Sequence, residues 1–171
     1  MSARNEPRHM SRDPRRPLIA AGVLLGAGLG GFFDGIVFHQ LLQWHNMFSA
    51  RLPPDNLLNA KLNMFWDGVF HAAVWLLTVI GLWQLHRVAL RSDVPWSGRT
   101  LLGAMAVGWG AFNLIEGLID HQLLGLHHVM DAAGNHWPAD LAFLASGVVL
   151  LVLGGWLIRT DTSRPRASPM R

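Results

Sequence analysis

Four long apolar segments dominate the sequence and restrict the chain to a membrane-spanning helical fold. They cover residues 18–43, 62–85, 101–124 and 139–158. Each is close to the ~20 residues that a helix needs to cross a bilayer. Only 15% of the residues are charged, against roughly 25% in soluble proteins. We therefore predict an all-α, integral membrane four-helix bundle over residues 18–158.

The basic residues predict how these helices are oriented. Arginines precede residue 18, separate the second and third segments and follow residue 158, and only Arg51 and Lys61 fall in the other two connections. Loops rich in Lys and Arg stay in the cytoplasm, so we expect cytoplasmic tails at residues 1–17 and 159–171. The first segment lacks the cleavage pattern of a signal peptide, and we interpret it as a retained helix.

The sequence also repeats itself. It reads D-G-I-V-F-H-Q-L-L-Q-W-H-N-M from Asp34 and E-G-L-I-D-H-Q-L-L-G-L-H-H-V-M from Glu116, and the acid and the first histidine are both offset by 82 residues. A repeat of this length predicts two duplicated helical hairpins that insert in the same orientation.

Acidic residues and histidines gather toward the non-cytoplasmic ends of the predicted helices. At ~1.5 Å per residue, Asp34 lies about 24 Å from the cytoplasmic start of its helix. Ionised carboxylates inside a membrane cost at least ~2.5 kcal/mol each, so these acids need partners. We predict a metal site with six candidate ligands: Asp34, His39, Asp67, His71, Glu116 and His121. Four outer residues are predicted to support it: His45, Asp120, His136 and Asp140.

Helical spacing relates some of these candidates. Asp67 and His71 are four residues apart and share one helical face. Asp34 and His39 are five apart, which puts them ~140° from each other around an α-helix. We therefore expect only one of Asp34 and His39 to face a given ion.

The available side chains limit which metal could bind. The chain has no Cys and no Tyr, so thiolate and phenolate ligands are excluded. His45-x-Met47 and His128-x-Met130 combine imidazole with thioether, which suits copper, although both pairs are interpreted first as ordinary residues at the edges of loops. Copper is the first prediction, and zinc and iron remain open because imidazole and carboxylate ligands accept all three.

Other functions remain open at this stage. The same acids and histidines could relay protons or cations, two histidines could be axial ligands of haem, or the polar cluster could only fix helix pairing. Nucleic-acid binding is excluded because the arginines flank apolar segments and form no basic, aromatic-rich surface. The lipid bilayer is the predicted environment, whereas enzyme activity and homo-oligomerisation remain undetermined.

One stretch resembles a known family. The residues G-F-F-D-G-I-V-F-H-Q-L-L-Q-W-H at positions 31–45, with D-G-V-F-H at positions 67–71, resemble a bacterial family of predicted membrane proteins of unknown function. The resemblance covers residues 18–158 and implies a four-helix protein of the bacterial inner membrane. It also implies an association with respiratory oxidase assembly, which would favour copper and assembly proteins as partners.

Overall fold

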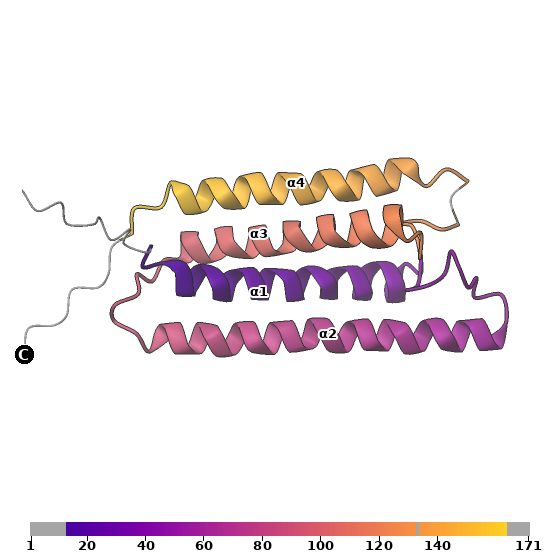
Figure 1. The fold of residues 1–171 in the computed structure, drawn as a ribbon, viewed down its shortest axis with the longest axis horizontal. Coiled ribbons are helices and arrows are strands. Elements are labelled where there is room, and N and C mark those ends of the chain that lie inside the picture. The colour runs from indigo at the N-terminus through magenta and orange to yellow at the C-terminus, as the bar shows by residue number, and fades with distance from the viewer. Residues whose placement is uncertain (1–12, 133, 164–171) are drawn as a thin grey trace, which may run out of the picture.

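The computed structural model describes residues 13–132 and 134–163, and these residues form helices without strands (Figure 1). The α-helices are α1 (Arg16–Phe33), α2 (Leu57–Ala89), α3 (Gly98–Glu116) and α4 (Trp137–Arg159). Two π-helices, η1 (Asp34–Leu41) and η2 (Gly117–Leu123), continue α1 and α3 directly. The all-helical prediction is confirmed, and four helical segments are long and apolar enough to cross a membrane. Residues 1–12 and 164–171 of the predicted tails lie outside the described residues.

Polar residues determine where the helices begin. The side chains of Asn56 and Ser97 cap α2 and α3 by accepting hydrogen bonds from the backbone N–H groups of Asn59 and Thr100. Each of α1 and α4 has a proline in its first turn, where its missing N–H costs nothing. The α2 helix starts at Leu57, five residues before the predicted apolar segment, because Asn56 caps it there.

The helices pack in a row with α1 and α3 at its centre. The α2 helix contacts α1 and the α4 helix contacts α3, so the central pair is flanked on both sides (Figure 1). Gly26 and Gly108 permit the central contact, since a Cβ atom on Gly26 would overlap the backbone of Met105, and one on Gly108 the backbone of Val23. Small residues allow membrane helices to approach this closely.

Both central helices end in the same way. In η1 the N–H of Leu42 donates to the carbonyl of Val37, and in η2 that of Leu124 donates to Ile119, each at 2.8 Å and each spanning five residues. The next residues, Gln43 and Gly125, have positive φ angles of 51° and 56°. This left-handed conformation turns the chain out of the helix.

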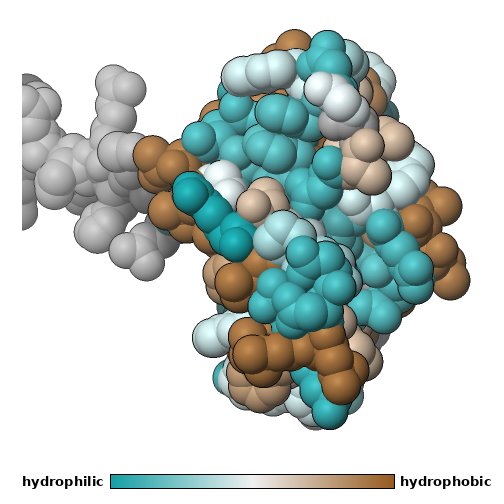
Figure 2. All heavy atoms as spheres, turned by 90° about the vertical axis from the view of Figure 1, so that its right-hand side faces the viewer, coloured by the Kyte–Doolittle hydropathy of each residue, from teal (hydrophilic) through white to brown (hydrophobic). Residues whose placement is uncertain are grey.

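The loops that follow cross over the end of the row. The N–H of Asp131 donates to the carbonyl of Trp44, and that of Ala50 donates to Leu126, both at 3.1 Å. Hydrophilic residues cover much of this end face of the molecule (Figure 2). The crossed loops therefore form a polar cap over the apolar helices.

Candidate metal centre

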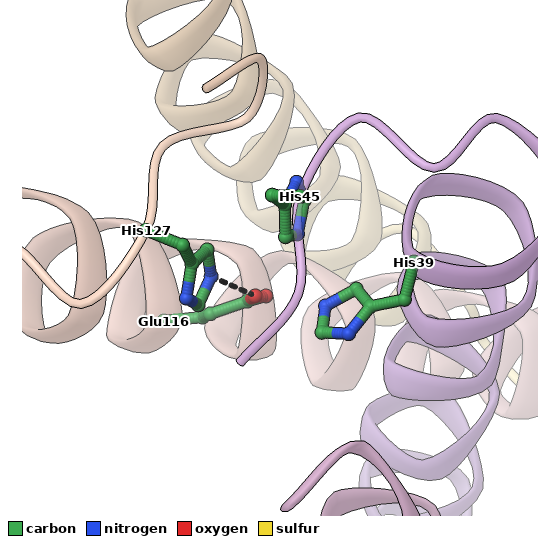
Figure 3. Close-up of side chains that lie close together, drawn as sticks. All are labelled: His39, His45, Glu116 and His127. Carbon is green, nitrogen blue, oxygen red and sulfur yellow. Dashed lines mark ion pairs between the residues drawn. The ribbon is translucent and has the colours of Figure 1, made fainter. Parts of the chain in front are cut away.

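Four buried side chains converge beneath this cap. His39 comes from η1, Glu116 from the end of α3, and His45 and His127 from the two crossed loops (Figure 3). Each offers a nitrogen or oxygen atom, and these atoms all lie within 4.8 Å of one another. Imidazole and carboxylate groups gathered in this way match the ligands of zinc, copper and iron sites.

The loop histidines point an unprotonated nitrogen into the cluster. The Nδ1–H of His45 donates to the carbonyl of Val129 (3.0 Å), and that of His127 donates to the carbonyl of Met47 (3.1 Å). Burial lowers the pKa of His45 to about 3 and also lowers the pKa of His127. Both rings are therefore neutral near pH 7, and a carbonyl can only accept, so the proton sits on Nδ1 and the lone pair on Nε2.

These lone pairs lack a hydrogen-bond donor. Neither Nε2 atom makes a hydrogen bond, although both are buried. His127 Nε2 lies 3.5 Å from Glu116 Oε1 (Figure 3). Two acceptors facing each other in a buried space require a proton or a cation between them. The separation also fits two ligands of one ion, because bonds of about 2.1 Å that meet at 90–109° place ligand atoms roughly 3.0–3.4 Å apart.

His39 lies between two carboxylates. Its Nδ1 is 3.0 Å from Asp67 Oδ1 and its Nε2 is 3.1 Å from Asp34 Oδ2, and the second contact lacks hydrogen-bond geometry. The contact between Nε2 and Asp34 thus requires a proton or a cation between the two atoms. A carboxylate on the far nitrogen orients many metal-binding histidines.

The expectation that Asp34 and His39 diverge by ~140° is wrong. The two side chains meet because the helix changes from α to π at Asp34. A π-helix bonds residue i to residue i+5, so residues five apart lie nearly one above the other.

Asp67 and Asp140 support the two halves of the cap in matching ways. Asp67 accepts hydrogen bonds from the N–H of Met47 (2.8 Å) and the side chain of Asn46 (2.9 Å). Asp140 accepts from the N–H of Val129 (2.9 Å) and from His128 Nδ1 (2.8 Å). Met47 and Val129, like Asn46 and His128, are 82 residues apart, whereas the acceptors Asp67 and Asp140 are 73 apart. The donors of these hydrogen bonds therefore recur at the offset of the sequence repeat.

The other sequence-predicted residues lie at different distances from the cluster. His121 is buried, its ring centroid is 4.8 Å from that of His127, and its Nδ1 is 3.6 Å from Asp140 Oδ1. His136 forms a separate, partly exposed group with His128 and Asp140. Asp120 is half-buried in η2.

His71 is not among the grouped side chains. Its Nδ1 donates to the backbone carbonyl of Asp67 (2.7 Å), and its ring packs beside Gly35 and Phe70. Of the six predicted ligands, His39 and Glu116 belong to the group of four, whereas Asp34, Asp67 and His121 lie around it.

From the sequence alone, His127 is interpreted as an ordinary residue at the edge of a loop, and His45 as an outer residue. The repeat contained the missing signal, because His45 plus 82 residues is His127. Pairing His45 with His128 through their methionines obscured this match, although the loop hydrogen bonds follow the 82-residue offset.

A family model described as "Predicted membrane protein (DUF2243)" matches residues 21–161. No curated protein and no solved structure is significantly similar to this chain. The match covers most of the chain, including most of α1, all of the other three α-helices and both crossed loops. The chain therefore belongs to this family of predicted membrane proteins.

Proposed function

We propose that this protein binds a transition metal at the outer end of its membrane domain through His39, His45, Glu116 and His127. The observation that carries the proposal is the pair of facing acceptors, His127 Nε2 and Glu116 Oε1, 3.5 Å apart in a buried space. Asp34 and His121 are further ligands for a larger coordination sphere. Copper is the first choice, because it binds such sites most tightly among the divalent first-row ions, with zinc and iron next.

The membrane placement is part of the same proposal. We place the chain in the bacterial inner membrane with both termini in the cytoplasm, so that the cluster lies on the opposite side. The two hydrogen bonds between the crossed loops, His45 to Val129 and His127 to Met47, are related by the 82-residue offset on both sides and support an origin by duplication of one hairpin. Copper handling for respiratory oxidase assembly and catalysis at the bound metal are the two roles that such a site would serve.

Haem fits the cluster poorly. Two axial histidines would hold the porphyrin between them, and here the other two ligand atoms fall within the same 4.8 Å. A proton or cation conduit would use the same residues without retaining an ion.

Metal content tests the proposal. Detergent-purified protein is loaded separately with copper, zinc or iron, desalted and measured by mass spectrometry together with its visible spectrum. We expect close to one ion per chain, with a strong loss in His45→Ala and His127→Ala. His86→Ala is the matched control, because His86 lies exposed on α2.

The other results would count against the proposal in different ways. If His71→Ala lost as much metal as His45→Ala and His127→Ala, the ion would be held by the ligand set predicted from the sequence. A Soret band would indicate haem. Protein that retains no metal after any loading would leave conduction or helix pairing as the role of the cluster.

A further inference from the structure

A cavity of about 540 Å³ lies between α1, α3 and α4, beside the metal-ligand cluster. Its volume is within the ~300–1,000 Å³ range of small-molecule sites. It extends from Trp44 and Val129 in the crossed loops to Leu150 in α4. Leu150 is about 20 Å along α4 from Trp137, at 1.5 Å per residue, so the cavity reaches deep into the membrane-spanning region.

The cavity is open to the lipid side of the bundle. Among the described helices α1 and α4 make no direct contact, which leaves the space over α3 between them uncovered. Phe33, which lines it, is 44% exposed, and Ala142 on the opposite wall is also exposed. A molecule dissolved in the bilayer could therefore enter sideways.

Aromatic side chains form much of the wall. Phe38 stacks on Trp44 with ring centroids 5.3 Å apart, and Phe33 lies 5.4 Å from Trp109. Phe143 faces them from α4. Nearly all of the exposed lining is apolar, and flat rings favour another flat ring through stacked or edge-to-face contacts.

One ionisable side chain, Asp34, lines this apolar space. It is 2% exposed, its Oδ1 has no hydrogen-bond partner, and its Oδ2 is 3.1 Å from His39 Nε2. A buried carboxylate with a free oxygen requires a donor. It would repel the phosphate of an anionic or zwitterionic lipid head group, whereas a hydroxyl group would satisfy it.

We propose that this cavity binds a lipid-soluble molecule of the quinol class, a hydroxyl-bearing aromatic ring on an apolar tail. The hydroxyl group donates to Asp34, the ring lies between the aromatic walls, and the tail follows α4 toward the bilayer centre. The inference goes beyond metal binding and does not require it. It places the head group next to His39, and so next to the proposed ion.

Photolabelling tests the proposal on the full-length protein in phosphatidylcholine nanodiscs. The probe is a long-chain 4-alkylphenol with a diazirine in its tail, and labelled residues are identified by mass spectrometry. We expect labelling concentrated on cavity residues of α3 and α4 and displaced by unlabelled decylhydroquinone. The O-methyl ether of the alkylphenol should compete at least about tenfold less well, because it cannot donate to the carboxylate.

Two variants on one helix provide the matched comparison. Ala142→Trp fills the cavity and should abolish the labelling, whereas Ala145→Trp should not, since Ala145 is exposed on α4 outside the cavity. Diffuse labelling of all lipid-facing helices, or equal labelling of both variants, would overturn the proposal. Equal competition by phenol and ether would overturn the hydroxyl assignment in favour of an acyl chain.

Metal content of the same samples separates this inference from the proposed function. Specific, hydroxyl-dependent labelling of protein that binds no metal would defeat the metal proposal alone. Stoichiometric metal without specific labelling would defeat the quinol-class site alone. The competition experiment uses unaltered protein, so its result does not depend on the folding of Ala142→Trp.

Discussion

His45 and His127 show how individual ring nitrogens define the cluster. Each uses Nδ1 to hold the carbonyl of the opposite loop, His45 at Val129 and His127 at Met47. This bond fixes the tautomer, so each Nε2 presents a lone pair to the buried space. The hydrogen bonds that close the cap are thus the ones that prepare its metal ligands.

Asp67 should affect metal binding indirectly, because its carboxylate orients the ring of His39. It receives hydrogen bonds from His39, Asn46 and Met47. In Asp67→Asn the amide NH₂ would face one of these donors, and His39 would lose its orientation. We expect metal affinity to fall about 10- to 100-fold, as is usual when such partners are removed.

Competition with a metal-binding dye measures this affinity. Asp93→Asn, at an exposed loop position, is the control and should bind like the unaltered protein. Unchanged affinity in Asp67→Asn would mean that His39 is oriented without this carboxylate, or is no ligand.

At the scale of helices, close contact along the centre of the row determines the spacing of the site. His39 is carried by the extension of α1 and Glu116 by the end of α3, so the separation of these helices sets the distance between the two ligands. Gly26 and Gly108 permit this separation.

Gly26→Ala should therefore destabilise the protein. Alanine normally stabilises a helix relative to glycine by about 1 kcal/mol, but here its Cβ would overlap the backbone of Met105, and overpacking costs about 1–3 kcal/mol. Gly155→Ala in α4 is the matched control, since nothing lies within 4 Å of its added Cβ. Thermal unfolding in detergent should show a lower midpoint for Gly26→Ala only, and similar midpoints would show that α1 and α3 can separate at little cost.

At the end of the molecule away from the metal-ligand cluster, Asp161 joins the start of α3 to the end of α4. Its carboxylate accepts hydrogen bonds from Ser163, Ser97 and Thr100, and these bonds lower the pKa of Asp161 below its usual value of 3.8. A lowered pKa in the folded state means that the stabilisation is present above about pH 4 and is lost as the pH falls further.

Asp161→Asn should lower the free energy of unfolding at pH 7 by on the order of 1 kcal/mol. The thermal unfolding midpoint should fall with it. The difference in unfolding midpoint between Asp161→Asn and the unaltered protein should become smaller as the pH is lowered below about 4. Asp55→Asn, exposed in the first crossed loop, controls for the loss of a surface charge. If the difference in unfolding midpoint stayed constant with pH, the charge of Asp161 would not contribute to the stability of the fold.

At the scale of the molecule, function depends on which side of the membrane the crossed loops face. The positions of the arginines predict that these loops lie outside the cytoplasm. A site there would exchange metal with the non-cytoplasmic side, and the cavity would be accessible from the outer half of the bilayer.

The absence of cysteine allows a direct test of this orientation. Asp55→Cys lies in a crossed loop and Ser92→Cys between α2 and α3, and both positions are exposed. In intact cells a membrane-impermeant maleimide should modify Asp55→Cys and leave Ser92→Cys unmodified until the cells are opened. The reverse pattern would put the metal-ligand cluster on the cytoplasmic side.

The sequence by itself determined the membrane-spanning helices and the general location of the polar residues. Burial in lipid depends on the summed hydrophobicity of about 20 consecutive residues, which is a local property. The concentration of histidines and acids at one end, and the 82-residue register of His39 and His121, are equally visible in the printed sequence.

Only the tertiary structure decided which of these residues meet. The change from α to π at Asp34 brought His39 beside it, and hydrogen bonds between loops about 80 residues apart brought His45 and His127 together. The same packing left His71 outside the group of four. Such contacts depend on how two loops close over the helix ends, because each loop supplies the partners that the other lacks, and no local pattern encodes that pairing.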